Sequence, residues 1–248
     1  MTEPSVQALL ARCPAWFTVT GTTAGSVEGI AYPPGTRWKA TGVALRIINF
    51  PQPTAAEQVP GTIFPARCPE RHIQHDQTFC LGLRYLTITG PDSADQWWVQ
   101  LEQFLKCQSV AEAAKVWPPA HALDHGAAGT FHERALAISR ELGIEEEYAA
   151  ARLDEPSWIT DPKLRLLDKS DGPINGRAPC PRGCRRRCMT KGRSSRPILR
   201  RACEHRALFL ELVVLERKRR SALAEYWKWV RSQGTLCCGR MLSCELKK

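Results

Sequence analysis

Short runs of β-branched and aromatic residues alternate with turn residues in the first part of the chain. Residues 15–32 and 42–50 are rich in Val, Ile, Phe and Thr, and Gly and Pro separate the runs. This pattern predicts β-strands. Prolines recur between residues 50 and 65, which predicts a segment without regular structure. A further short apolar run, 81–89, precedes the next Gly-Pro breaker.

Helical periodicity dominates after residue 90. Apolar residues at helical spacing predict helices over 93–108 and 130–142, with Ser93 as the N-cap and Gly143 as the stop. A third, longer helical pattern covers residues 206–231. Because the strands come first and the helices follow, we expect an α+β fold: an antiparallel sheet flanked by helices.

Charge and cysteine content divide the chain near residue 176. Downstream of this point lie 20 Lys and Arg against 5 Asp and Glu, together with seven of the eleven cysteines. The net charge of +10 therefore arises from the C-terminal part. Pro and Gly recur just before it, as in a linker. We predict a folded domain over 1–155, a linker over 156–178, and a basic, cysteine-rich helical module over 179–248.

The sequence also carries information about location. No apolar run approaches the roughly 20 residues that span a bilayer, and the N-terminus lacks the features of a secretory signal. We therefore expect a cytoplasmic protein with no membrane partner. Because that compartment is reducing, the eleven cysteines indicate thiol or metal chemistry instead of a disulfide framework.

Cys80 has the most polar surroundings of the N-terminal cysteines. His72, His75 and Asp76 lie within the eight residues before it. A nucleophilic thiol needs a polarising neighbour, and an oxyanion needs a fixed hydrogen-bond donor. A turn between His72 and Cys80 would bring both groups to one surface. The other cysteines of this part are expected to be inert small core residues: Cys13, Cys68 and Cys107.

Four features follow one another in a fixed order between residues 42 and 108. An aliphatic strand ends in Phe50-Pro51, a proline-rich segment follows, the turn 76–82 surrounds Cys80, and Trp97-Trp98 opens an amphipathic helix. In this order they resemble the catalytic core of ubiquitin-conjugating enzymes, in the divergent form found in bacterial ubiquitin-like conjugation operons. The resemblance implies the fold of that family.

The same resemblance implies an activity. Cys80 would accept the C-terminus of a ubiquitin-like protein as a thioester from an activating enzyme, and would pass it to an amine of an acceptor protein. His72 would stabilise the tetrahedral oxyanion in the place of the family's Asn, and Asp76 is a further candidate catalytic residue. By family association, the pathway would be bacterial antiviral defence. A thiol near its ordinary pKa suffices for such an exchange, so no dedicated base is needed.

The chain departs from the family pattern at several positions. His72 replaces the Asn, Glu70-Arg71 replaces the His-Pro pair, and Gln77 replaces the usual Gly. The Trp pair comes late, which indicates an insertion around residues 87–95. These departures leave two alternatives open. One is a catalytically degenerate zinc adaptor that binds a ubiquitin-like protein or nucleic acid, and the other is a thiol hydrolase.

The C-terminal cysteines are spaced for a metal. Thiolates and imidazole at this density in a reducing compartment are best explained by structural Zn²⁺. A first group contains three cysteines at intervals of four and a Cys-x-His pair further on: Cys180, Cys184, Cys188, Cys203 and His205. Three more cysteines complete the same site or form another: Cys237, Cys238 and Cys244. Three histidines outside this region are expected to be structural: His121, His125 and His132.

The basic residues of the C-terminal part suggest a charged partner. Lys and Arg density drives phosphate binding, so nucleic acid is possible. Few aromatic residues lie near Arg185-Arg186-Arg187 to stack on bases, however. By the residues alone, a basic face for an acidic protein partner is at least as good an interpretation. The resemblance favours it over nucleic acid, because a conjugating enzyme docks an activating enzyme and a ubiquitin-like protein.

Overall fold

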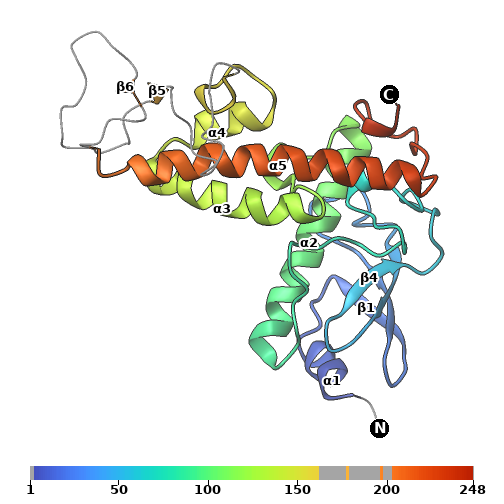
Figure 1. Cartoon of the computed structure of the whole chain (residues 1–248). Coiled ribbons are helices and arrows are strands. Elements are labelled where there is room, and N and C mark those ends of the chain that lie inside the picture. Colours follow the sequence, from blue (N-terminus) through green and yellow to red (C-terminus); the bar gives the residue numbers. More distant parts are fainter. Residues whose placement is uncertain (1–2, 162–176, 179–195, 198–202, 248) are drawn as a thin grey trace. The chain divides into compact units, whose positions relative to one another are not determined.

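The computed structural model describes residues 3–161, 177–178, 196–197 and 203–247 (Figure 1). The chain divides into two compact units. The sheet unit comprises Met1–Leu123 and Val230–Lys248, and the helical unit comprises Asp124–Trp229. These limits do not coincide with the predicted boundaries at 155 and 178. Those boundaries stay a prediction, because most of the stretch between them lies outside the described residues.

The sheet unit contains a four-stranded antiparallel sheet whose strands follow chain order. They are β1 (Phe17–Thr22), β2 (Val27–Ala31), β3 (Val43–Ile48) and β4 (Thr54–Glu57). The first three confirm the strands expected from the sequence. β4 shows that the expectation of no regular structure between residues 50 and 65 was wrong. Its four residues contain no proline, so they pair with β3 without loss of a backbone donor.

The two middle strands alternate between buried and more exposed side chains, as a sheet with one face on the core requires. The fully buried positions on these strands are Val27, Ala31, Val43, Leu45 and Ile47. Gly29 also lies on β2. A Cβ atom at Gly29 would lie 2.4 Å from the ring of Phe17, so only glycine lets β1 and β2 approach at this point.

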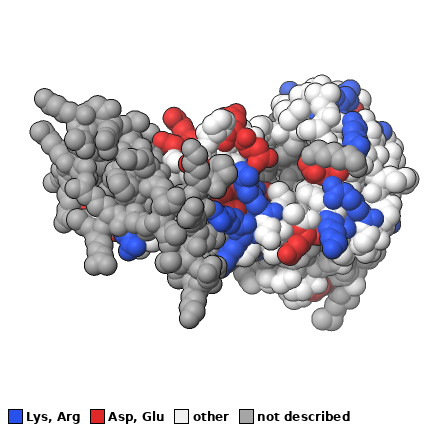
Figure 2. All heavy atoms as spheres, turned by 45° about the horizontal axis from the view of Figure 1, so that its top comes forward, with Lys and Arg blue, Asp and Glu red and all other residues white. Residues whose placement is uncertain are grey.

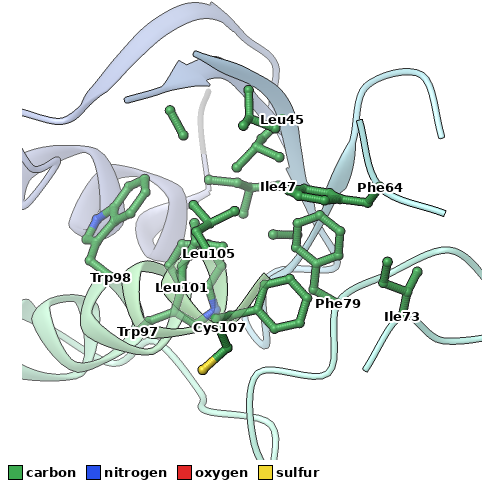
Figure 3. Close-up of a cluster of buried hydrophobic side chains, with 14 of the residues drawn as sticks. Leu45, Ile47, Phe64, Ile73, Phe79, Trp97, Trp98, Leu101, Leu105 and Cys107 are labelled. Atoms are coloured by element: carbon green, nitrogen blue, oxygen red, sulfur yellow. The ribbon is translucent and has the colours of Figure 1, made fainter. Parts of the chain in front are cut away.

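Helix α2 supplies much of the core that covers the sheet. Two α-helices precede residue 124: α1 (Pro4–Ala11) and α2 (Pro91–Ala114). Figure 3 shows side chains of α2, β3 and the following loops in one buried cluster. Trp97, Leu101 and Leu105 of α2 are almost fully buried within it. Each large apolar side chain buried in this way contributes about 1.5–3 kcal/mol to folding, so the cluster fixes α2 on the sheet unit.

The start of α2 differs in detail from the prediction. The N-cap is Gly90, and Ser93 lies three residues further on. The Ser93 Oγ accepts hydrogen bonds from the backbone N–H groups of Thr89, at 2.9 Å, and Gly90, at 3.1 Å. Ser93 therefore still stabilises the beginning of the helix, but from inside its first turn.

The C-terminal residues are part of the sheet unit. Met241 and Cys244 are buried in its core. The backbone N–H of Leu242 donates to the carbonyl of Lys115 at 2.8 Å. The Arg240 guanidinium donates to the carbonyl of Ile63 at 2.7 Å. Residues more than a hundred positions apart are thus held together by hydrogen bonds and by apolar burial.

The helical unit is built from helices that the sequence largely anticipates. They are α3 (Ala127–Leu142), α4 (Glu145–Arg152) and α5 (Arg206–Ser232), whose last residues belong to the sheet unit. Gly143 ends α3 with a φ of 62°, the left-handed conformation that favours glycine. Two residue pairs form the short strands β5 (Arg177–Ala178) and β6 (Arg196–Pro197). No described helix is long and apolar enough to cross a membrane. The α+β fold class is confirmed.

A buried ionic network lies within the helical unit. Arg219 of α5 pairs with Glu216 at 2.7 Å and with Asp124 at 2.9 Å. The Nδ1 atom of His132 lies 2.8 Å from Asp124. Burial alone would raise the pKa of Asp124, but the His132 and Arg219 contacts together lower it. This network satisfies the charges that the packing of the helices buries.

Candidate functional site

The loop that carries Cys80 is folded back on itself and joined to the sheet. Isolated β-bridges pair Cys68 with Ile73, and Ile73 with Phe79. The backbone N–H of Phe79 donates to the carbonyl of Ala55 in β4 at 2.7 Å. The ring of Phe79 stacks on Phe104 of α2 with centroids 4.6 Å apart. The residue before Cys80 is therefore anchored to both the sheet and the helix (Figure 3).

Cys80 lies directly after this anchor and is half-buried. Its backbone N–H donates to the carbonyl of His72 at 2.8 Å, so the loop brings the backbones of the two residues together. That both side chains share one surface stays a prediction. The Cys80 thiol donates to the carbonyl of Gly82 at 3.6 Å. Burial raises the pKa of the thiol above its ordinary value of 9.0, and the backbone contact at Gly82 opposes this only in part. Burial thus favours the protonated form of the Cys80 thiol.

His72 has a backbone conformation that limits which residues can occupy it. Its φ of 54° lies in the left-handed region, where Asn, Asp and His are enriched among non-glycine residues. His therefore replaces the family's Asn at a position whose backbone suits both. The imidazole is buried, and its centroid lies 4.7 Å from that of Trp117. Its role as an oxyanion donor stays a prediction.

The turn between His72 and Cys80 is organised by Asp76. The Asp76 carboxylate accepts hydrogen bonds from the backbone N–H of Thr78, at 3.1 Å, and from its hydroxyl, at 2.7 Å. Gln77, where the family has Gly, has a φ of 71°. Asp76 therefore holds the turn that leads to Cys80, and its predicted catalytic role stays a prediction. His75, in the same turn, is exposed.

Arg71 is a site residue that the sequence analysis missed. Its guanidinium is fully buried and donates to the side chain of Gln108, at 2.7 Å, and to Glu112, at 2.6 Å, both on α2. The Gln108 side chain returns a hydrogen bond to the Arg71 carbonyl at 2.7 Å. Arg71 thus fixes the residue before His72 to α2. An isolated arginine in a loop carries no sequence signal for burial.

Glu57 at the end of β4 is a second residue that the sequence did not reveal. Its buried carboxylate accepts hydrogen bonds from the backbone N–H groups of Gly61, Ile63 and Phe64, at 2.7–3.2 Å. Burial raises its pKa, and the three backbone donors oppose this shift. Glu57 thereby holds residues 61–64, which follow the sheet, in a fixed conformation. This positions Phe64 against the Cys80 loop, with the centroid of the Phe64 ring 5.6 Å from that of Phe79.

The predicted zinc ligands fall into three groups. Cys180, Cys184 and Cys188 lie outside the described residues. Cys203 and His205 belong to the helical unit, where the His205 ring lies 3.4 Å from Glu204. The last group belongs to the sheet unit: Cys237, Cys238 and Cys244. Within the described ranges, no three or more Cys, His, Asp or Glu side chains are arranged around a metal position.

The remaining histidines have ordinary packing partners. His125 stacks on Tyr226 with centroids 4.9 Å apart, and burial lowers its pKa to about 4. His121 contacts the Gln103 side chain at 3.2 Å. In Figure 2, basic and acidic side chains lie interspersed on the face shown.

Comparison with known proteins agrees with this geometry. Residues 16–119 match the model of the prokaryotic E2 domain. Residues 124–246 match the model of a cysteine-rich domain C-terminal to the E2 domain. No curated protein and no solved structure matches the chain. The two matches together extend over nearly the whole chain and bear out the resemblance around Cys80. The chain therefore belongs to the prokaryotic E2 family of ubiquitin-like conjugation, with the associated cysteine-rich domain following the E2 domain.

Proposed function

We propose that the protein is a conjugating enzyme that carries the C-terminus of a ubiquitin-like protein as a thioester on Cys80. The observation that carries the proposal is the anchored loop. Phe79 is fixed to β4 and α2, and the half-buried Cys80 follows it, with His72 beside it on the neighbouring backbone. A thiol held on a rigid support next to a short exposed segment is suited to docking a carrier and exchanging its acyl group.

The reaction has two acyl transfers. In the first, the Cys80 sulfur attacks the thioester carbonyl of the activating enzyme's adduct and forms a new C–S bond. The old C–S bond breaks, and the activating enzyme's thiol leaves with the proton that Cys80 gives up. In the second, an amine of the acceptor protein attacks the Cys80 thioester. An amide forms, and Cys80 leaves as a thiol. Exchange between thioesters is close to balanced, so it needs no strong base.

The raised pKa of Cys80 fits a carrier better than a hydrolase. A hydrolase needs a thiolate activated by a neighbouring imidazole or by another positive group. The pKa of Cys80 is instead raised by burial, and its thiol donates to a carbonyl. A protonated thiol also resists oxidation and alkylation between encounters. It reacts when a thioester is held against it by the partners.

The proposal includes the partners and the setting. The partners are an activating enzyme, a ubiquitin-like protein and an acceptor protein, since each transfer requires a donor or an acceptor. The setting is a bacterial defence pathway against viruses. The proposal also includes Zn²⁺ in the cysteine-rich domain. A short basic segment has only a small apolar core, and a metal bound by its many thiols would stabilise its fold. Chelation of that metal is expected to lower the melting temperature.

The test is formation of a thioester adduct. The full chain is mixed with its activating enzyme, ATP and the ubiquitin-like protein, and the products are separated on a gel without reductant. We expect an adduct that reductant removes. Cys80→Ala abolishes the adduct, whereas Cys13→Ser, which alters another partly buried thiol, leaves it unchanged.

Two outcomes would contradict the carrier function. One is an adduct that persists in Cys80→Ala. The other is no adduct in the wild-type chain together with full biological function of Cys80→Ala in cells. The second result indicates the zinc adaptor instead, and loss of function on deleting residues 179–248 then identifies the part that acts.

A further inference from the structure

Trp117 packs its indole against the imidazole of His72. The two ring centroids lie 4.7 Å apart, with an angle of 49° between the ring planes. This separation is within the roughly 4.5–7 Å over which aromatic rings attract one another. Both side chains are buried, with 5% of His72 and 8% of Trp117 exposed. The indole therefore limits the rotation of the imidazole about its side-chain torsions.

The indole of Trp117 is itself held in place. Helix α2 ends before Lys115, whose left-handed φ of 60° redirects the chain. The indole N–H of Trp117 donates to the carbonyl of His121 at 3.0 Å. The centroid of its ring lies 5.8 Å from that of Phe104 on α2. Trp117 is therefore fixed by a hydrogen bond and by a helix contact, neither of which involves the Cys80 loop.

The same residue of α2 supports the other side of the candidate site. Phe104 also stacks on Phe79, with the ring centroids 4.6 Å apart, and Phe79 directly precedes Cys80. The backbone N–H of Cys80 donates to the carbonyl of His72 at 2.8 Å. These contacts form a closed circuit that runs from Cys80 through Phe79, Phe104, Trp117 and His72 and returns to Cys80. A displacement of the imidazole relative to Cys80 must therefore disturb at least one of them.

We propose that Trp117 is a positioning residue that holds the His72 imidazole for the acyl transfers at Cys80. The inference rests on the proposed function, in which the imidazole donates a hydrogen bond to the oxyanion. A donor that is held in place before the charge develops needs no reorganisation during the reaction, and its stabilising effect is then largest. An imidazole presents a flat aromatic ring to an indole, so Trp117 fixes His72 through ring packing.

Trp117 is also part of the apolar core, so its replacement lowers stability whatever its role, and a matched control is needed. Trp98 provides it. Trp98 is 3% exposed, its indole N–H donates to the carbonyl of Leu9 at 3.1 Å, and its ring lies 5.0 Å from that of Phe17. Trp117→Leu and Trp98→Leu therefore each remove a buried indole and a hydrogen bond to a carbonyl. Only the first removes the ring beside His72.

The first test locates the imidazole by NMR on the full chain with isotope-labelled histidine. Among the six histidines, His72 is identified by the signals that disappear in His72→Asn. We expect a nuclear Overhauser effect between the ring protons of His72 and Trp117 in the unaltered protein, and a ring-current shift of the His72 signals. Trp117→Phe keeps a ring and therefore a shift, Trp117→Leu loses the shift, and Trp98→Leu leaves it unchanged.

The second test measures the rate at which the Cys80 thioester is discharged to free lysine in a single turnover. We expect Trp117→Leu to slow discharge by up to about 100-fold, the scale of a small misplacement in an active site. Trp117→Phe recovers most of the rate, and Trp98→Leu leaves it unchanged. In a double-mutant cycle, Trp117→Leu has no further effect in the His72→Gly chain, because the group that it positions is gone.

Four results would overturn the proposal. They are the absence of the Overhauser effect in the unaltered chain, His72 signals that Trp117→Leu does not move, equal slowing of discharge by Trp117→Leu and Trp98→Leu, and additive effects of His72→Gly and Trp117→Leu. A wild-type chain that forms no thioester contradicts the proposed function, and the positioning role falls with it. A thioester that the Trp117→Leu chain discharges at the wild-type rate overturns the positioning role alone.

Discussion

Two residues of the Cys80 loop have left-handed backbone conformations, and their side chains suit that conformation to different degrees. His72, with a φ of 54°, belongs to a residue type that tolerates the region. Gln77, with a φ of 71°, does not, because its Cβ crowds the backbone there. The resemblance to conjugating enzymes predicts glycine at Gln77. The turn geometry explains that preference in physical terms.

Gln77→Gly is expected to stabilise the protein. Glycine adopts a φ of 71° without the strain of a Cβ atom, and the gain is about 1 kcal/mol less the entropy that glycine adds to the unfolded chain. We expect a rise of a few tenths to about 1 kcal/mol in the free energy of unfolding, measured by urea denaturation. Gln77→Ala keeps the Cβ and serves as the control. A glycine variant that is no more stable than the alanine variant would contradict the claim that the backbone at Gln77 is strained.

The reactivity of Cys80 is expected to rise with pH through and beyond pH 9. Burial raises the pKa of its thiol above 9.0, so the folded chain holds the protonated form until the pH exceeds that value. Only the thiolate reacts with iodoacetamide. The rate of Cys80 alkylation, followed by peptide mass spectrometry, should therefore reach its midpoint at higher pH than that of an unfolded cysteine peptide. A midpoint below that of the peptide would indicate an activating neighbour and would favour the hydrolase.

At the residue scale, the sequence singles out Cys80 as the candidate nucleophile but does not reveal the residues that support its loop. Cys80 stands out because of its polar neighbours, and the spacing to His72 anticipates their backbone contact. Arg71 and Glu57 are charged residues in a loop and at a strand end, and such residues are normally exposed. Their burial depends on partners that lie far away in the sequence, such as Gln108 for Arg71. The local sequence around Arg71 and Glu57 does not indicate those partners.

At the element scale, periodicity predicts the long helices and the regular strands well. The strands up to residue 48 and α2, α3 and α5 follow their apolar patterns. β4 escapes prediction because it has only four residues, all of them small or polar, within a proline-rich segment. Its strand conformation is imposed by pairing with β3. α1 is eight residues long, and helices of that length depend on tertiary packing.

The joint between the Cys80 loop and α2 depends on Arg71. Arg71→Ala removes a fully buried guanidinium, leaves the side-chain oxygen of Gln108 without its donor, and leaves Glu112 with Lys115 as its remaining cation. We expect a loss of about 3 kcal/mol in the free energy of unfolding. Arg12→Ala is the matched control, since Arg12 forms an exposed ion pair with Asp95 and its removal should leave stability unchanged within error. Equal losses in the two variants would contradict an anchoring role for Arg71.

At the scale of the whole molecule, the predicted domain boundaries stay a prediction. Composition assigns everything after residue 178 to one basic module, because charge and cysteine content change there. The structure groups Val230–Lys248 with the sheet. The contacts responsible join residues 127 to 177 positions apart, among them Leu242 with Lys115 and Arg240 with Ile63. Composition describes which residue types a segment contains. It does not indicate where in space the residues after α5 lie, and these contacts depend on that position.

Two adjacent residues test whether the C-terminal segment is part of the core of the sheet unit. Met241 is 3% exposed and packs in the core, whereas Leu242 is 70% exposed. Met241→Ala is expected to cost about 2–5 kcal/mol in the free energy of unfolding, because it removes buried apolar volume. Leu242→Ala should stay within about 0.5 kcal/mol of the wild type. Both are measured by urea denaturation of the full chain, with intrinsic tryptophan fluorescence reporting on the core around Trp97 and Trp98. Equal stability of the two variants would mean that the C-terminal segment does not pack on the E2 domain in solution.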